Sequence, residues 1–203
     1  MGDTMSGLIE RGRKGQSVAQ AETEACRAQL PLRYLRQQAH LTAPANDLAL
    51  AEKAISGAPR VAARLLDKYG ITPEMLAERF GVTVDDVHVA LHETSTPLVL
   101  LDLEDGVPPS LVDEARANAV QLFREADWGS SLRFFRPPSL AEERCTDDIV
   151  EVLMRSGEGL PVDRFPIDGM VFPKVRHVHE VAWLYDLLDE IERELGLPAN
   201  RIR

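Results

Sequence analysis

The sequence predicts an α/β fold built from parallel strand–helix units, and three observations support this prediction. Residues 98–101 form a bare apolar run that is too short for a helix and typical of a strand covered on both faces. Amphipathic helical patterns then alternate with two further strand-like runs, at 132–137 and 168–175. The chain has 203 residues, which suffices for one buried core, so one large domain is favoured over two.

Composition argues against several classes of partner. The chain carries 33 acidic and 23 basic residues and a net charge of −10, which disfavours binding to nucleic acid or other polyanions. No stretch approaches the length of a membrane span, and residues 1–30 lack the apolar core of a signal peptide. We therefore expect a cytoplasmic protein with no nucleic-acid or membrane partner.

The first 30 residues differ in character from the rest. They are polar, with an alanine- and glutamate-rich piece, and we interpret residues 1–30 as a flexible or peripheral helical arm. Residues 31–203 are expected to form the domain. Its first strand is predicted at 36–44, and Asn46 or Asp47 then caps a helix that runs to about residue 56.

Residues 57–96 are predicted to form an all-helical insertion in this domain. Helices are expected at 60–69, 73–80 and 84–91. The segment 76–91 has the spacing of a helix-turn-helix with Gly81 at the turn, so a DNA-binding or regulatory module is one hypothesis. Asp85 and Asp86 open the would-be recognition helix, and acids there repel phosphate. We interpret the insertion as a helical decoration, and salt-sensitive DNA binding would favour the alternative.

The remaining elements repeat one unit. Helices are predicted at 111–126, 139–156 and 177–195, and strands at 98–101, 132–137 and 168–175. The order is strand, helix, helical insertion, and then strand–helix three times, which indicates parallel βα units. Residues 201–203 look like the start of a fifth strand. A complete (β/α)8 TIM barrel needs about 250 residues, so the chain carries roughly its first four βα units plus the insertion.

Three carboxylates follow the central strand. Asp102, Glu104 and Asp105 lie at its carboxyl end, which is the edge where ligands bind in α/β folds. Asp102 and Glu104 point to the same side of an extended chain, and Asp105 begins the turn. Acids this close repel one another, so a cation, an arginine or shared protons should compensate them. The alternative is that the acids only solvate a turn made by the following glycine and prolines.

Several blocks together resemble a known family. LDLEDGV at 101–107, Glu-Ala-Arg at 114–116, Leu-Arg at 132–133 and DGMVFPKV at 168–175 resemble the citrate lyase β-subunit and malyl-CoA lyase-like aldolases. Thr-Ala-Pro-Ala-Asn at 42–46 is also similar to the first strand and Pro-x-Asn turn of that family. The family lies among the phosphoenolpyruvate/pyruvate-type TIM barrels. The resemblance runs from about residue 36 to residue 203 and is interrupted by the insertion.

The resemblance implies a Mg²⁺-dependent carbon–carbon lyase or aldolase. Its substrate would be a hydroxyacyl-CoA, which would bring coenzyme A to the site, or a small 2-oxo or hydroxy acid. In such enzymes Mg²⁺ holds the carboxylate and keto oxygens of the substrate, and the metal and an arginine stabilise charge that develops on oxygen. Barrels of this family usually assemble symmetrically, so a homo-oligomer is expected.

The resemblance also implies roles for individual residues. Arg133 would bind the substrate carboxylate or the enolate. Glu104 and Asp105, with Asp102, would order the arginine and the metal-bound water, so Arg133, Glu104 and Asp105 are the candidate catalytic residues. Lys174 would lie at the mouth of the barrel. Candidate substrate-binding residues are Arg133, Lys174, Asp102 and Asn46.

The chain departs from the family in two places. The family usually has Arg-Val-Asn on its third strand, whereas residues 133–135 are Arg-Phe-Phe, so a polar contact is missing. The two direct metal ligands of the family would lie beyond Arg203, so no metal ligand is expected within the chain. We therefore expect the 203-residue chain to lack lyase activity and an extended version to have it. A non-catalytic interaction remnant of the barrel is the remaining alternative. An open half barrel would leave two unpaired sheet edges, which favours association or poor solubility.

Overall fold

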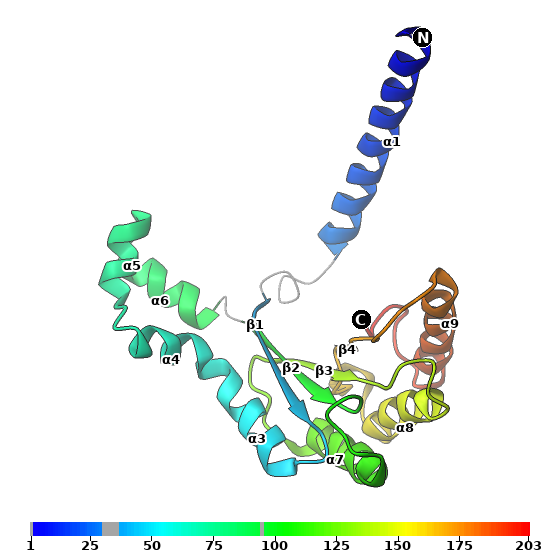
Figure 1. Ribbon diagram of the computed structural model, residues 1–203. Helices are drawn as coiled ribbons and strands as arrows, with labels where there is room; N and C mark the ends of the chain where they lie inside the picture. The colour runs from blue at the N-terminus through cyan, green and yellow to red at the C-terminus, as the bar shows by residue number, and fades with distance from the viewer. Residues whose placement is uncertain (1, 30–36, 94–95) are drawn as a thin grey trace. The chain divides into compact units, whose positions relative to one another are not determined.

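The computed structural model describes residues 2–29, 37–93 and 96–203, which fall into two compact units (Figure 1). One unit comprises Met1–Arg36 and contains the helix α1 (Gly2–Gln29). The other comprises Gln37–Arg203 and contains the sheet. Among the described residues, no helix combines the length and the apolar character that crossing a membrane requires.

The second unit has four strands and seven α-helices in its described residues. The strands are β1 (Gln37–Pro44), β2 (Thr96–Asp102), β3 (Leu132–Arg136) and β4 (Gly169–Met170). The helices are α3 (Leu48–Gly57), α4 (Val61–Lys68), α5 (Pro73–Phe80), α6 (Val84–Glu93), α7 (Val112–Glu125), α8 (Cys145–Gly157) and α9 (Val178–Glu194). Short 3-10 turns span Ala58–Arg60, Pro109–Leu111 and Val162–Arg164. The predicted alternation of strands and helices is confirmed.

All four strands are parallel, and their order in the sheet is β1-β2-β3-β4. Pro44 pairs with Asp102 and Asp102 with Arg136, so the carboxyl ends of the first three strands share one edge. A doubly wound sheet reverses its strand order part-way, whereas this one proceeds in sequence. The helices α3, α7, α8 and α9 form an arc around the sheet (Figure 1). The chain therefore has an α/β fold that is compatible with part of a TIM barrel.

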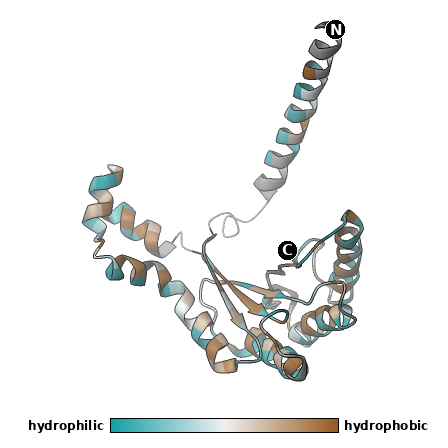
Figure 2. Ribbon diagram, in the orientation of Figure 1, coloured by the Kyte–Doolittle hydropathy of each residue, from teal (hydrophilic) through white to brown (hydrophobic). Residues whose placement is uncertain are grey.

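The core lies between the helices and one face of the sheet. Val99, Leu101 and Phe135 point to this face and are fully buried. The helices contribute Ala51, Ile55, Ala115, Ala119, Leu122, Phe123, Ile149, Val152 and Leu153. The strands are largely hydrophobic, and the helices around them are amphipathic, with both hydrophobic and hydrophilic residues (Figure 2). Residues at the alternate positions of β2 and β3 line the other face and are buried as well: Leu98, Leu100, Leu132 and Phe134. Branched and aromatic side chains on both faces are typical of barrel strands.

The sheet continues beyond β4. The Arg203 N–H donates to the Asp168 carbonyl (3.0 Å), and the Met170 N–H donates to the Arg203 carbonyl (2.7 Å). This pair of bonds around Gly169 is the pattern of a parallel strand, which agrees with the expected start of a fifth strand. A Cβ at Gly169 would lie 2.1 Å from the Arg203 carbonyl oxygen, so the close approach requires glycine there.

The strand predicted at 168–175 is much shorter than expected. Only Gly169–Met170 pair as β4. Pro173 has no N–H to donate, and Lys174 has a φ of 52°, which turns the backbone away from an extended path. Residues 171–175 therefore form a loop at the carboxyl edge of the sheet.

The insertion forms its three predicted helices. Thr72 caps α5 through the Met75 N–H, and Gly81, with φ of 67°, ends it. Thr83 and Asp86 cap α6 reciprocally: the Thr83 hydroxyl accepts from the Asp86 N–H, and the Asp86 carboxylate accepts from the Thr83 N–H. The helices α5 and α6 thus have Gly81 at the expected turn. Asp86, an acid that would repel DNA phosphate, caps α6.

Candidate functional site

The turn after β2 wraps around the carboxylate of Asp102. This side chain is buried and accepts hydrogen bonds from the backbone N–H groups of Glu104 (3.0 Å) and Gly106 (3.1 Å). A Cβ at Gly106 would lie 2.9 Å from the Asp102 Oδ2 atom. Glycine therefore lets the backbone close over the acid, and the acid fixes the direction of the turn.

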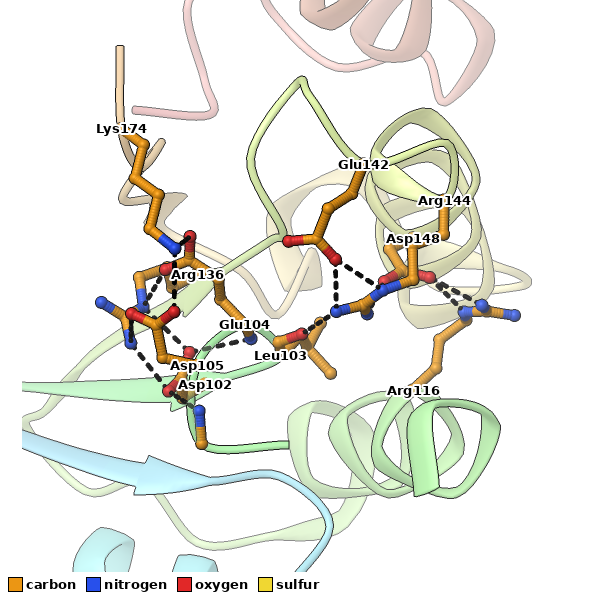
Figure 3. Close-up of polar contacts among 11 residues, drawn as sticks. Asp102, Leu103, Glu104, Asp105, Arg116, Arg136, Glu142, Arg144, Asp148 and Lys174 are labelled. Carbon is orange, nitrogen blue, oxygen red and sulfur yellow. Dashed lines mark hydrogen bonds and ion pairs between the residues drawn. The ribbon is translucent and has the colours of Figure 1, made fainter. Parts of the chain in front are cut away.

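Arg136 compensates the acids. It is the last residue of β3, and the strand register places it beside Asp102. Its Nε and Nη2 atoms donate to the two Asp102 carboxylate oxygens at 2.9 and 2.8 Å, and Nε lies 3.3 Å from Glu104 Oε2 (Figure 3). The Nη2 atom also lies 3.8 Å from Asp105 Oδ2. This bidentate pair holds the Nε–Nη2 edge of the guanidinium against the acids.

The arginine also sets the protonation of Asp102. Burial acts to raise the pKa of Asp102, but the hydrogen bonds from Arg136 and from the Glu104 and Gly106 amides outweigh it, so the pKa lies below its ordinary value. The same contact with Asp102 raises the pKa of Arg136. Both groups are therefore charged at neutral pH.

Lys174 reaches the same acids from the loop after β4. Its Nζ atom lies 2.8 Å from Asp105 Oδ1 and 3.0 Å from Glu104 Oε1 (Figure 3). Hydrogen bonding to Asp105 raises the pKa of Lys174. Its left-handed backbone is uncommon for a residue with a side chain, and such conformations cluster at functional sites.

Glu104 lies between the two cations. Its carboxylate is 2% exposed and forms ion pairs with Arg136 and Lys174. Lys174 Nζ is within hydrogen-bonding distance of Oε1, and Arg136 Nε faces Oε2 at 3.3 Å. Two cations therefore satisfy this buried acid within the described residues.

Asn46 lies just beyond the carboxyl end of β1. The neighbouring Ala45 N–H donates to the Asp102 carbonyl (2.9 Å), and the Asn118 amide donates to the Ala45 carbonyl (3.0 Å). These bonds fix the turn beside Asp102. The Asn46 Oδ1 atom is buried and has no hydrogen-bond partner in the described part of the chain. A buried amide oxygen in this state is a candidate contact for a ligand.

Arg133 lies elsewhere. It lies near the amino end of β3 and pairs with Val99 of β2. Its backbone N–H donates to Asp168 Oδ2 at 2.9 Å, and its Nε atom lies 3.3 Å from the same oxygen. Arg133 is three positions before Arg136, which is about 10 Å along a strand and on the opposite face. The structure therefore brings together Asp102, Glu104, Asp105 and Lys174, with Asn46 on the neighbouring strand end, and it does not bring Arg133 to them.

Arg136 was the residue that sequence reasoning missed, although a signal for it exists. Pro137 and Pro138 end β3, so the residue before them must stand at the carboxyl edge of the sheet. Asp102 stands at that edge on β2. The strand end, rather than the family motif, identifies the partner of the acids.

A second charged cluster supports the turn from the helix side. Asp148 on α8 is fully buried and accepts from Arg116 Nε (2.8 Å) and from Arg144 Nη1 (2.7 Å). Arg144 Nη2 also donates to the carbonyl of Leu103, the residue before Glu104 (3.1 Å; Figure 3). The contacts with Asp148 and Glu151 outweigh burial and raise the pKa of Arg116. The cluster thereby ties α7, α8 and the turn after β2 together.

A cavity of about 540 Å³ lies between the two clusters. Glu104 and Asp105 line one side of it, and Arg116, Glu142 and Arg144 line the other. Such a volume is within the range of small-ligand sites. Neither Arg136 nor Lys174 lines this cavity.

The described residues do not form a metal centre by themselves. Among them, no group of three or more His, Cys, Asp or Glu side chains is placed to hold a metal ion. The acids at the sheet edge are instead neutralised by Arg136 and Lys174. This donor set does not fit Mg²⁺ without ligands from elsewhere.

Two L-malyl-CoA/beta-methylmalyl-CoA lyases from strains of Cereibacter sphaeroides are similar in sequence to part of the chain. Each is 30% identical to the chain over 103 residues. The chain is distantly similar to malyl-CoA lyase. The match covers 51% of the chain and 30% of each lyase, so the chain spans less than a third of the length of these relatives. No protein-family model matches the chain.

Proposed function

We propose that the chain carries the substrate-binding edge of a carbon–carbon lyase of the malyl-CoA lyase type. The observation that supports this most directly is Arg136, whose guanidinium is held by buried Asp102 and Glu104 at the carboxyl edge of a parallel sheet. The distant similarity to two malyl-CoA lyases supports the same class. The proposed substrate is a hydroxyacyl-CoA or a small 2-oxo or hydroxy acid.

The chemistry of such a cleavage fits these residues. Breaking the carbon–carbon bond of a 3-hydroxyacyl thioester leaves the electron pair on a thioester enolate. The hydroxyl carbon becomes a carbonyl as its hydroxyl proton passes to a general base, and the enolate then takes up a proton. Negative charge develops on oxygen, and preorganised cations in a partly closed site stabilise it without reorganisation. Arg136 and Lys174 supply two cations, and Glu104 and Asp105 hold them in place.

Mg²⁺ is part of this proposal, with ligands outside the described residues. When bound, the metal would polarise the substrate carbonyl and carboxylate oxygens as a Lewis acid. The residues described here act on the substrate by charge and position. In this proposal the chain binds the substrate by itself, whereas turnover also requires Mg²⁺ held by ligands outside the described residues.

The test measures binding and turnover with the same 203-residue protein. Glyoxylate binding is followed by calorimetry, and L-malyl-CoA cleavage is followed by release of the free 2-oxo acid with and without Mg²⁺. We expect glyoxylate to bind and turnover to be absent. Arg136→Ala should weaken glyoxylate binding about tenfold or more, which corresponds to a loss of roughly 1.4 kcal/mol or more of binding free energy.

Matched arginine variants make this test specific. Arg133→Ala removes the arginine that the family resemblance favours, and Arg136→Ala removes the one that the structure places beside the acids. Arg136→Lys shows whether the fold tolerates the change, and circular dichroism checks each variant. Absence of glyoxylate binding would overturn the proposal and leave the interaction-only remnant. Turnover by the unmodified chain would show that it is active as it stands.

A further inference from the structure

A second cavity, of about 240 Å³, has Lys174 in its lining. The loop after β3 contributes residues 139–141 to it, and the loop after β4 with the first turn of α9 contributes Lys174, Arg176 and Glu180. This cavity shares no lining residue with the larger one beside α7. It therefore lies next to the acids at the sheet edge, with Lys174 as the residue that belongs to both places.

Arg176 is the base of this cavity that lacks an acidic partner. Its side chain is exposed, and its guanidinium forms no ion pair with another residue in the described ranges. Lys174, by contrast, is paired with acids. The Arg176 backbone N–H donates to Glu180 Oε2 at 3.0 Å, which anchors the residue. The guanidinium therefore keeps its planar set of donors, which suits phosphate and carboxylate oxygens.

Ser139 lines the same cavity from the loop after β3. It is 7% exposed, and its carbonyl accepts from the Glu142 N–H at 2.9 Å, which fixes the turn after Pro138. Its hydroxyl has no hydrogen-bond partner among the residues that the structure describes. Buried hydroxyls usually have a partner, because an unmade hydrogen bond costs free energy. This hydroxyl is therefore a candidate donor to a ligand in the cavity.

We infer that this cavity binds a phosphate group. The Arg176 guanidinium and the Ser139 hydroxyl donate to its oxygens, and Lys174 adds a further positive charge. The donors come from two different loops, and a phosphate presents oxygens in several directions, whereas a carboxylate presents two in one plane. A phosphate therefore uses both sides of the cavity at once.

Two sources can supply this group. One is the coenzyme A part of the proposed thioester substrate, and in that case the inference rests on the proposed function. The other is a free phosphate ion that binds beside the substrate. Both present the same oxygens to Arg176 and Ser139, so the site is defined by these residues and the source is decided by experiment.

Glu180 is the one acid among the described residues that line the cavity, and its charge opposes an anion. Its carboxylate also accepts from the Arg176 N–H. Glu180→Gln keeps an oxygen that can accept this hydrogen bond and removes the negative charge. This variant should therefore bind phosphate about threefold or more tightly than the wild-type chain.

Isothermal titration of the 203-residue chain with inorganic phosphate, with and without saturating glyoxylate, tests the inference. Phosphate should bind equally well in both conditions, because glyoxylate is expected at Arg136 and phosphate at Arg176. Arg176→Ala should weaken phosphate binding about tenfold or more and leave glyoxylate binding unchanged. Ser139→Ala should weaken phosphate binding about threefold or more. Arg164→Ala removes an exposed arginine outside the cavity and should change neither affinity.

Titration with coenzyme A and with pantetheine, which has no phosphate, identifies the source. Coenzyme A that binds more tightly than pantetheine and loses this advantage in Arg176→Ala assigns the site to the substrate. Coenzyme A that binds no better than pantetheine assigns it to free phosphate. Absence of phosphate binding, displacement of phosphate by glyoxylate, or equal losses in Arg176→Ala and Arg164→Ala would overturn the inference. Phosphate binding without glyoxylate binding would overturn the proposed function alone. Circular dichroism checks that each variant is folded.

Discussion

At the scale of single residues, Asp102 is the centre of the site. Its carboxylate closes the turn through two backbone amides and fixes Arg136 through two further hydrogen bonds. Four hydrogen bonds to one buried carboxylate favour its charged form, which explains its lowered pKa. The order of the turn and the position of the arginine therefore depend on one ionised group.

This dependence predicts how stability changes with pH. Because the pKa of Asp102 is lower in the folded chain than in the unfolded chain, its contribution is present above the unfolded pKa and is lost as the pH falls through the folded value. Asp102→Asn should lower the free energy of unfolding at pH 7 by about 1–3 kcal/mol. Urea denaturation from pH 7 down to acid should show a smaller difference between the two proteins as the pH falls. A constant difference would contradict this role.

Lys174 shows a second residue-scale effect. Its left-handed backbone turns the loop after β4 so that the ammonium group reaches Glu104 and Asp105. Such a conformation is unfavourable for a residue with a side chain, and in this loop it is accompanied by contacts with two acids. The family motif identified this lysine, and the structure shows that acids rather than the sheet hold its position.

At the scale of elements, α7 and α8 act as the support of the site. Asp148 on α8 joins Arg116 on α7 to Arg144, which in turn holds the carbonyl of Leu103. A shift of α8 would therefore move the turn that carries Glu104. The cluster thus links α7, α8 and the turn after β2 through one buried carboxylate.

The cluster makes Asp148 a strong test of this support. Asp148→Ala leaves two arginines without their buried partner and should lower the free energy of unfolding by about 3–5 kcal/mol. Asp147→Ala is the matched control, because Asp147 is exposed in the same turn of α8, and it should change stability by less than about 0.5 kcal/mol. Both values come from urea denaturation at pH 7. If the two substitutions lowered the free energy of unfolding equally, Asp148 would not have the supporting role proposed for it.

At the scale of the whole molecule, stability is distributed unevenly. The sheet and the helices around it share one core, while α4, α5 and α6 have only two buried hydrophobic residues, Ala77 and Val87, in their described part. Segments with few buried contacts open more readily than core strands. The insertion is therefore expected to behave as a separate cooperative unit.

Hydrogen exchange followed by mass spectrometry checks this expectation. Backbone amides of α5 and α6 should exchange faster than those of β2 and α7. Protection of α5 and α6 equal to that of β2 would contradict the weak packing of these helices.

Much of the fold could be predicted because its signals are local. The apolar run of β2, the alternating helical patterns, and the glycines and prolines that end them specify four parallel strand–helix units and a helical insertion. The acids at the end of β2 were found in the same way. The length of β4 was overestimated, because the apolar character of residues 171–175 does not reveal that the backbone leaves the sheet.

The sequence by itself determined the order of the elements and the edge of the sheet where the acids lie, since both depend on patterns within about ten residues. Tertiary structure alone decided which cation meets which acid. Arg136 rather than Arg133 joins Asp102 because hydrogen bonding between β2 and β3 sets their register, and one step along a strand moves a side chain to the other face. The burial of Asp148 likewise results from packing between helices far apart in the chain.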